Sequence, residues 1–209
     1  MAEELQIDSL SEAYTMNGGD GCYSYTKNSK YQKEAIFSAK ELIIQAIVER
    51  LDIKSLSSLD ICRIADLGCS VGPNTFFVVQ NIMEAVKSKY KILGLDSYLP
   101  EFQVFFSDHS SNDFNTLFTS LPQDRQYYVV GVPGSFYNKL FPDSSLLIVH
   151  SSYSIRWISK VPNEVVSKTS SAWNKGKVYY SVPQMQSLRL MQLSIRRTWT
   201  DICVIAQKK

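Results

Sequence analysis

The sequence predicts an α/β fold, in which a mostly parallel β-sheet carries flanking helices. Two observations support this prediction. Short apolar runs that suit buried strands alternate with segments of helical periodicity, which is typical of parallel sheets. Within residues 63–77, RIADLGCSVGPNTFF, a strand, a glycine-punctuated turn and a helix start follow one another. With 209 residues, of which 44% are hydrophobic, the chain is long enough for one domain with a sizeable core.

The turn after the first strand has the features of a ligand site. Gly68 and Gly72 permit backbone conformations and close contacts that a Cβ would forbid, and Pro73 suits the first turn of a helix. A strand, such a turn and a helix N-terminus together can hold the polar face of a nucleotide-like ligand. Asp66 disfavours a phosphate, and only part of the G-x-G-x-x-G spacing is present, so the residues favour S-adenosylmethionine over NAD. A turn that only packs the strand against the helix is the alternative, and it stays open at this point.

Composition and charge narrow the classes of protein and partner. The net charge is +2, from 22 basic and 20 acidic residues without a block of like charge, so we expect no nucleic-acid partner. The apolar runs are too short to cross a bilayer, and the start, MAEELQIDSL, lacks the apolar region of a secretory signal, so we expect no membrane partner. The four cysteines have no metal-site spacing, which predicts a metal-free protein in a reducing, cytoplasmic compartment.

The chain begins with a segment that has little periodicity. Residues 11–32 are rich in Gly, Ser, Asn and Tyr, and we interpret residues 1–30 as a loop segment of the active site. Several tyrosines with apolar rings and polar tips favour an ordered segment lying over a site. From residue 31 to 51, apolar side chains recur at three- and four-residue spacing, which predicts a long amphipathic helix.

Four strands and two further helices follow. Strands are predicted at residues 61–66, 101–107, 127–132 and 145–150, with helices at about 74–89 and 112–121. Asp108, at the end of the second strand, stands where α/β nucleotide folds hold a ribose diol. The alternative, that Asp108 caps a helix starting near Ser111, stays open.

Sites in parallel sheets collect at the carboxyl ends of the strands. Gly68, Asp108, Ser135 and residues 151–157 would therefore share one rim. His109 and His150 lack a metal-ligand partner in the sequence, and we interpret both as ordinary rim or core histidines.

Five ordered motifs then carry a family resemblance: MNGGDGCYSYTKNSKYQ, RIADLGCSVGPNTF, FFSDHSSNDFN, GVPGSFY and SSYSIRWISKVP. With them, residues 10–177 resemble the plant SABATH methyltransferases, which act on salicylate, jasmonate, indole-acetate and xanthine-type acceptors. The resemblance implies a Rossmann-like class I methyltransferase fold that uses S-adenosylmethionine. It implies methyl transfer to the carboxylate of a small acid in plant secondary metabolism, and a homodimer.

The resemblance also implies two sets of binding residues. Asp108 would hold the ribose hydroxyls and Phe136 would cover the adenine, while Gln32 and Trp157 would donate side-chain N–H bonds to the acceptor carboxylate. The methyl donor would be surrounded by Tyr25, Asp66, Gly68, Cys69, Asn74, Asp108, His109, Ser135 and Phe136. The methyl acceptor would be surrounded by Gln32, Tyr153, Arg156 and Trp157.

Two further points concern the role of Arg156 and the choice of catalytic residues. An Arg156 guanidinium at the acceptor would favour an anion, although a solvent-facing Arg156 is the open alternative. No catalytic acid or base is assigned, because a carboxylate is already a nucleophile at neutral pH and the transfer depends on proximity and alignment.

Length sets this chain apart from the family. Family members are considerably longer, so we expect a C-terminally truncated member: residues 31–185 form a partial donor-binding domain, without the helical cap and the last strands. Residues 186–209 have no family character, and we hypothesise an out-of-frame tail from a frameshift or altered splicing. Two other functions remain as alternatives. One is a catalytically silent protein that retains donor binding or pairs with a full-length relative, and the other is an NAD-linked oxidoreductase.

Overall fold

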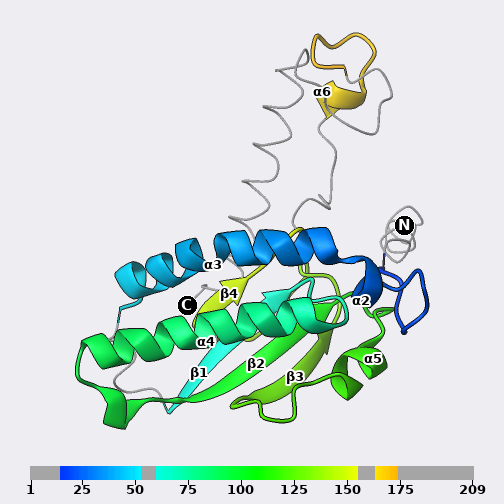
Figure 1. The fold of residues 1–209 in the computed structure, drawn as a ribbon. Coiled ribbons are helices and arrows are strands. Elements are labelled where there is room, and N and C mark those ends of the chain that lie inside the picture. Colours follow the sequence, from blue (N-terminus) through cyan, green and yellow to red (C-terminus); the bar gives the residue numbers. More distant parts are fainter. Residues whose placement is uncertain (1–14, 53–59, 155–162, 174–209) are drawn as a thin grey trace.

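A computed structural model describes residues 15–52, 60–154 and 163–173. Its centre is a four-stranded parallel sheet with the strand order β3-β2-β1-β4 (Figure 1). The strands are β1 (Ile61–Leu67), β2 (Glu101–Asp108), β3 (Tyr128–Pro133) and β4 (Ile148–His150). The predicted parallel sheet is confirmed, and because all four strands run the same way, their carboxyl ends meet at one edge.

Two long helices form layers over one face of this sheet. Helix α4 (Pro73–Ile92) lies on the sheet, and α3 (Lys30–Arg50) packs on α4 (Figure 1). Pro73 occupies the first turn of α4, where its missing N–H leaves no gap in the helix. Between the helices the rings of Phe37 and Phe77 lie 5.7 Å apart, and the Lys33 ammonium contacts both rings.

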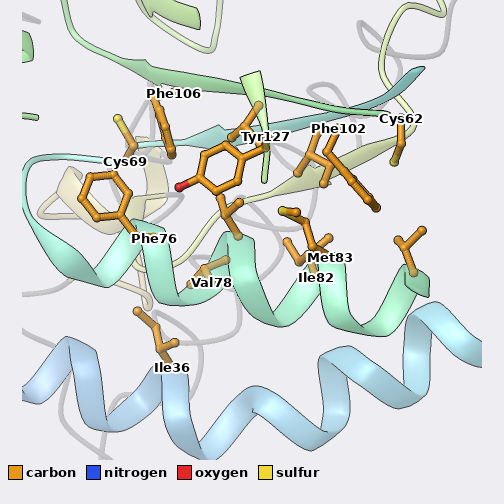
Figure 2. Close-up of a cluster of buried hydrophobic side chains, with 14 of the residues drawn as sticks. Ile36, Cys62, Cys69, Phe76, Val78, Ile82, Met83, Phe102, Phe106 and Tyr127 are labelled. Carbon is orange, nitrogen blue, oxygen red and sulfur yellow. The ribbon is translucent and has the colours of Figure 1, made fainter. Parts of the chain in front are cut away.

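The core lies between α4 and the sheet. Alternate strand residues point toward α4, and near the start of α4 the rings of Phe76 and Phe106 meet edge to face at 5.7 Å (Figure 2). Ile36 reaches this core from α3. Leu42 does not, because its side chain is 69% exposed, so one of the apolar positions that predict the helix faces outward.

The sheet has a second, smaller apolar cluster on the face away from α4. It centres on Ala65 and Leu67, which alternate with the core-facing residues of β1, and partly buried side chains surround them. These side chains are Phe105, Phe136, Phe141, Leu146 and Val149. The cluster ties the segment after β3 to the end of β1.

Short elements complete the described chain: α2 (Tyr25–Asn28), η3 (Asp96–Tyr98), α5 (Phe114–Thr119) and α6 (Asn163–Val166). The prediction of a continuous loop at 11–32 is wrong for α2 and for the start of α3 at Lys30. Helix α5 and strand β4 are shorter than predicted. A turn ends α5 at Ser120, and a turn from Pro142 to Ser145 precedes β4. Among the described helices, none has the length and apolar character needed to cross a membrane. The predicted tail at 186–209 lies outside the described residues.

Candidate functional site

Backbone hydrogen bonds join the turns at the carboxyl ends of β1 and β2. The N–H groups of Gly68 and Cys69 donate to the carbonyl oxygen of Ser107, at 2.7 and 3.1 Å. Gly68 has φ +80°, a conformation that side chains disfavour, and an added Cβ would lie 2.3 Å from the Ser154 Cβ. Position 68 therefore requires glycine both for its backbone and for the close approach of the segment after β4.

The Asp108 carboxylate lies at this turn. It accepts hydrogen bonds from the backbone N–H groups of Ser70, at 2.7 Å, and of His109, at 2.8 Å. Burial raises the pKa of the Asp108 carboxyl above its usual value, although both hydrogen bonds lower it. A carboxylate has about four acceptor sites, so two bonds leave capacity for a diol.

The alternative role of Asp108, as a helix cap, is wrong. The N-cap of α5 is Asp113, whose carboxylate accepts from the backbone N–H of Thr116 at 2.9 Å. The backbone carbonyl oxygen of Asp108 accepts a hydrogen bond from the N–H of Gly134 at 2.8 Å. The turn after β3 is thereby joined to the end of β2.

Asp66 is the second carboxylate of this edge. It is buried, and the Thr75 hydroxyl on α4 donates to its Oδ2. The Nδ1 atom of His150 lies 2.8 Å from its Oδ1. The prediction of His150 as a rim histidine agrees with this position, and its partner is the Asp66 carboxylate.

Cys69 and Tyr25 carry protonated side chains at neutral pH. Burial raises the pKa of the Cys69 thiol well above its usual value, and the nearby Asp108 and Asp66 carboxylates raise it further. Burial also raises the pKa of the Tyr25 hydroxyl, although its hydrogen bond with Asn74 lowers it. Neither group is therefore ionised as a nucleophile or base in this site.

The described part of the N-terminal segment, residues 15–29, lies against the glycine turn, which is the turn at residues 68–72 between β1 and α4. The tyrosines of this segment predict such an ordered position over a site. Asn74, in the first turn of α4, donates from Nδ2 to the Ser29 carbonyl oxygen at 3.2 Å. A Cβ on Gly72 would lie 2.8 Å from the Thr26 Oγ1, which shows how closely α2 approaches this turn. Farther along, the N–H of Gly19 donates to the Asp113 carboxylate at 2.8 Å.

The segment after β4 is fixed to the same turn. The hydroxyls of Ser151 and Ser154 both donate to the Leu67 carbonyl oxygen, at 2.9 and 2.7 Å. Tyr153, a predicted acceptor residue, has φ +67°, and its ring meets that of Tyr31 edge to face at 5.9 Å.

Other predicted residues take the following positions. Gln32 follows Tyr31 on α3, so the Tyr31–Tyr153 contact brings two of the acceptor elements together. Arg156 and Trp157 lie outside the described residues. Ser135 accepts from the N–H of Tyr137 at 3.3 Å, and the Phe136 ring packs 4.8 Å from that of Tyr137, beside the end of β1.

Several buried polar atoms at this edge have no hydrogen-bond partner within the described part of the chain. Buried polar groups in proteins are nearly always paired, so such a group indicates a partner such as a ligand or water. The unpaired atoms of the glycine turn and the segments around it are Ser24 Oγ, Thr26 Oγ1, Gln32 Oε1, Ser70 Oγ, Ser107 Oγ and Asn112 Oδ1. A ligand with hydroxyl and amino groups fits these hydrogen-bonding atoms, whereas the residues predicted to surround the methyl donor include no Lys or Arg to pair with a phosphate.

The sequence reasoning did not assign the supporting roles of four residues of the site. Thr75 and His150 hold Asp66, and Ser151 and Ser154 hold the Leu67 carbonyl. Thr75 carried a signal, because it lies in the first turn of the helix that follows the glycine turn. The two serines lie in a predicted rim segment, but nothing in the sequence indicates that a main-chain carbonyl is their partner.

Comparison with known proteins identifies the family. The model of a family described as SAM dependent carboxyl methyltransferase matches residues 11–191. The chain belongs to this family. The resemblance to the SABATH methyltransferases is therefore confirmed, and the parallel sheet with its flanking helices is the Rossmann-like fold of a SAM-dependent methyltransferase.

Individual members of the family are closely similar to this chain. It is 50% identical over 173 residues to loganic acid O-methyltransferase of Catharanthus roseus, covering 81% of this chain and 46% of that enzyme. It is 49% identical over 170 residues to farnesoic acid carboxyl-O-methyltransferase of Arabidopsis thaliana, covering 79% of this chain and 47% of that enzyme.

A solved structure of a loganic acid methyltransferase with SAH superposes with a TM-score of 0.76 at 44% identity. That match covers 91% of this chain and 54% of the solved chain. The chain thus spans about half the length of the family members it matches.

Proposed function

We propose that the carboxyl edge of the sheet binds S-adenosylmethionine and that the protein is a methyltransferase for the carboxylate of a small plant acid. The observation that carries the proposal is the position of Asp108. Its carboxylate is anchored on the Ser70 N–H, at the glycine turn that leaves the neighbouring parallel strand. In α/β nucleotide folds, a carboxylate at the end of the second strand binds the two ribose hydroxyls.

The residues around Asp108 support a donor site. Asp66 provides a buried negative charge close to the turn, which suits a cationic ligand without phosphate. The Ser70 hydroxyl, which has no hydrogen-bond partner among the described residues, would provide a further polar contact. Phe136 brings an aromatic ring to the same edge, for stacking on the adenine.

When bound, S-adenosylmethionine supplies a methyl group on a sulfonium, which is a strong methyl donor. An acceptor carboxylate is ionised at neutral pH and needs no base to activate it. The task of this chain is therefore to align the acceptor and to keep water out. Gln32 and Trp157 would bind its carboxylate through N–H groups, and Arg156 would add positive charge.

The named relatives support the acceptor class. Both act on carboxylic acids, loganic acid in one case and farnesoic acid in the other. The Tyr31–Tyr153 contact supports a common pocket for the acceptor residues on α3 and after β4. A small acid with an apolar body would suit the aromatic rings of these two residues.

Methyl transfer from a labelled donor to a panel of acids tests the proposal. The panel contains loganic acid, farnesoic acid and salicylic acid, with a neutral xanthine as the contrasting acceptor. We expect label in a methyl ester of at least one acid. Gln32→Leu should lower kcat/KM about 10- to 150-fold, because a hydrogen bond to a charged group contributes about 1.5–3 kcal/mol. Ser38→Ala, on the exposed side of the same helix, is the matched control.

Two results would contradict the proposal in different ways. Donor binding without transfer to any acid would leave a silent protein that retains its donor site. Failure to bind the donor at all would remove both the donor site and the enzyme.

The partner and compartment are proposals as well. We propose a homodimer, in a cytoplasmic protein of plant secondary metabolism. Within the described part of the chain Cys22, Cys62 and Cys69 are free, which a reducing compartment permits. Sedimentation at several concentrations would test the dimer, and fractionation of plant cells would test the compartment.

A further inference from the structure

The pair of Asp66 and His150 suggests a role that none of the predicted binding residues has. We propose that His150 is a positioning residue, which orients the Asp66 carboxylate in the donor site. This inference rests on the proposed function, since it concerns how the donor-binding carboxylate is held.

The sheet places the two residues side by side. Strands β1 and β4 are parallel neighbours, and Asp66 and His150 are register partners at the last paired position. Side chains of register partners share a face of the sheet. The distance of 2.8 Å from His150 Nδ1 to Asp66 Oδ1 is that of a hydrogen bond. The side chain of His150 is 15% exposed and that of Asp66 is 7% exposed.

The partners of Asp66 determine where the imidazole carries its proton. An ionised carboxylate only accepts hydrogen bonds, and its Oδ2 already accepts from the Thr75 hydroxyl. The Nδ1 atom of His150 must therefore carry a proton and donate it to Oδ1. In the neutral ring, this tautomer leaves Nε2 as an acceptor. A buried carboxylate without such donors would be unfavourable, so His150 and Thr75 together fix its rotamer.

The position of His150 connects this carboxylate to the rest of the site. Asp66 lies two residues before Gly68, and its negative charge reaches Asp108, since it raises the pKa of that carboxyl. On the other side, His150 directly precedes Ser151, whose hydroxyl donates to the Leu67 carbonyl. A change at His150 should therefore shift the orientation of Asp66 without removing any group that contacts the methyl donor.

Nitrogen-15 NMR of histidine-labelled protein tests the proton assignment without any ligand. The chain has two histidines, so His109→Gln assigns both spectra. Above about pH 8, where an ordinary imidazole is neutral, we expect a proton on Nδ1 of His150. A bare Nδ1 with the proton on Nε2 would overturn the inference.

Calorimetry with S-adenosylmethionine and S-adenosylhomocysteine tests the effect on the donor site. In His150→Asn the amide N–H can take the place of Nδ1–H. In His150→Leu the side chain has a similar size but no hydrogen-bond donor. We expect the Leu variant to bind about tenfold more weakly and the Asn variant to stay within about threefold of the wild type. Thermal melting of both variants separates this effect from a loss of folding.

The outcomes distinguish the inference from the proposed function. Equal binding by the wild type and His150→Leu would overturn the positioning role alone. Equal weakening in His150→Asn and His150→Leu would also overturn it, because the donated hydrogen bond would then not matter. If the wild type bound neither nucleoside, the proposed function and the inference would both fall.

Discussion

Replacing Gly68 by alanine tests how closely the segment after β4 packs on the glycine turn. The φ of Gly68 is +80°, and the new Cβ would lie 2.3 Å from the Ser154 Cβ. Ordinary carbon contacts lie at about 3.5–4.0 Å, so the backbone of one segment would have to move by about 1 Å or more. Ser154 would then lose its hydrogen bond to the Leu67 carbonyl or be displaced together with it.

Gly94→Ala is the matched control. Gly94 has φ +67°, but nothing lies within 4 Å of its added Cβ. The left-handed conformation costs alanine about 1–2 kcal/mol, and the stiffer unfolded chain offsets about 0.4–1 kcal/mol of this. We therefore expect Gly94→Ala to destabilise by about 1 kcal/mol. Crowding at Gly68 adds about 1–3 kcal/mol, so Gly68→Ala should destabilise by about 2–4 kcal/mol.

Urea unfolding followed by circular dichroism measures both variants, provided the m-values agree. A melting temperature lower by about 4–16 °C should accompany Gly68→Ala. The double variant Gly68→Ala with Ser154→Gly removes the opposing Cβ and should recover part of the loss. If Gly68→Ala destabilised no more than Gly94→Ala, the close packing of the two segments would be refuted.

Three further predictions concern the rim. Asp113→Ala removes the N-cap of α5 and the anchor of Gly19, so it should destabilise by about 1 kcal/mol and speed amide exchange at Gly19; unchanged urea midpoint and exchange would contradict this. Burial raises the pKa of the Asp108 carboxyl above its usual 3.8 in the folded state. The stability of the ligand-free protein should therefore fall as the pH rises from about 3.8 through the raised pKa of the folded state. Asp108→Asn should lack this component, and a pH-independent difference between the two proteins would refute it. In a Cys203→Ser background, a thiol reagent should modify exposed Cys22 quickly and Cys69 only after unfolding, whereas equal rates would show that Cys69 is accessible.

The sequence predicted the regular elements that apolar periodicity determines. The helix at 31–51 and the strands at 61–66 and 101–107 lie within a residue or so of α3, β1 and β2. Their patterns are long or strongly apolar, so packing and propensity agree. Strand β4 is shorter than the run at 145–150, because apolar content does not show where pairing with β1 begins. The short helix α2 was missed because four residues carry no helical period.

The candidate site was predicted as a set of segments rather than as a set of contacts. The position of Asp108 beside the glycine turn follows from the parallel sheet, and it was expected. Its partner, the Ser70 N–H, depends on the turn conformation, which a sequence pattern does not define. The partners of Asp66 come from α4 and from β4, and His150 is 84 residues away in the chain. Pairings at such separation follow only from the strand order.

The central claim is that the edge of the sheet at Asp108 holds the nucleoside of the methyl donor. Calorimetry with S-adenosylhomocysteine, on the wild type and on Asp108→Asn, tests it most directly. We predict that the wild type binds one equivalent and that Asp108→Asn binds at least about tenfold more weakly, since it loses charged hydrogen bonds to the ribose hydroxyls. A wild type that does not bind, or an Asp108→Asn variant with unchanged affinity, would contradict the claim.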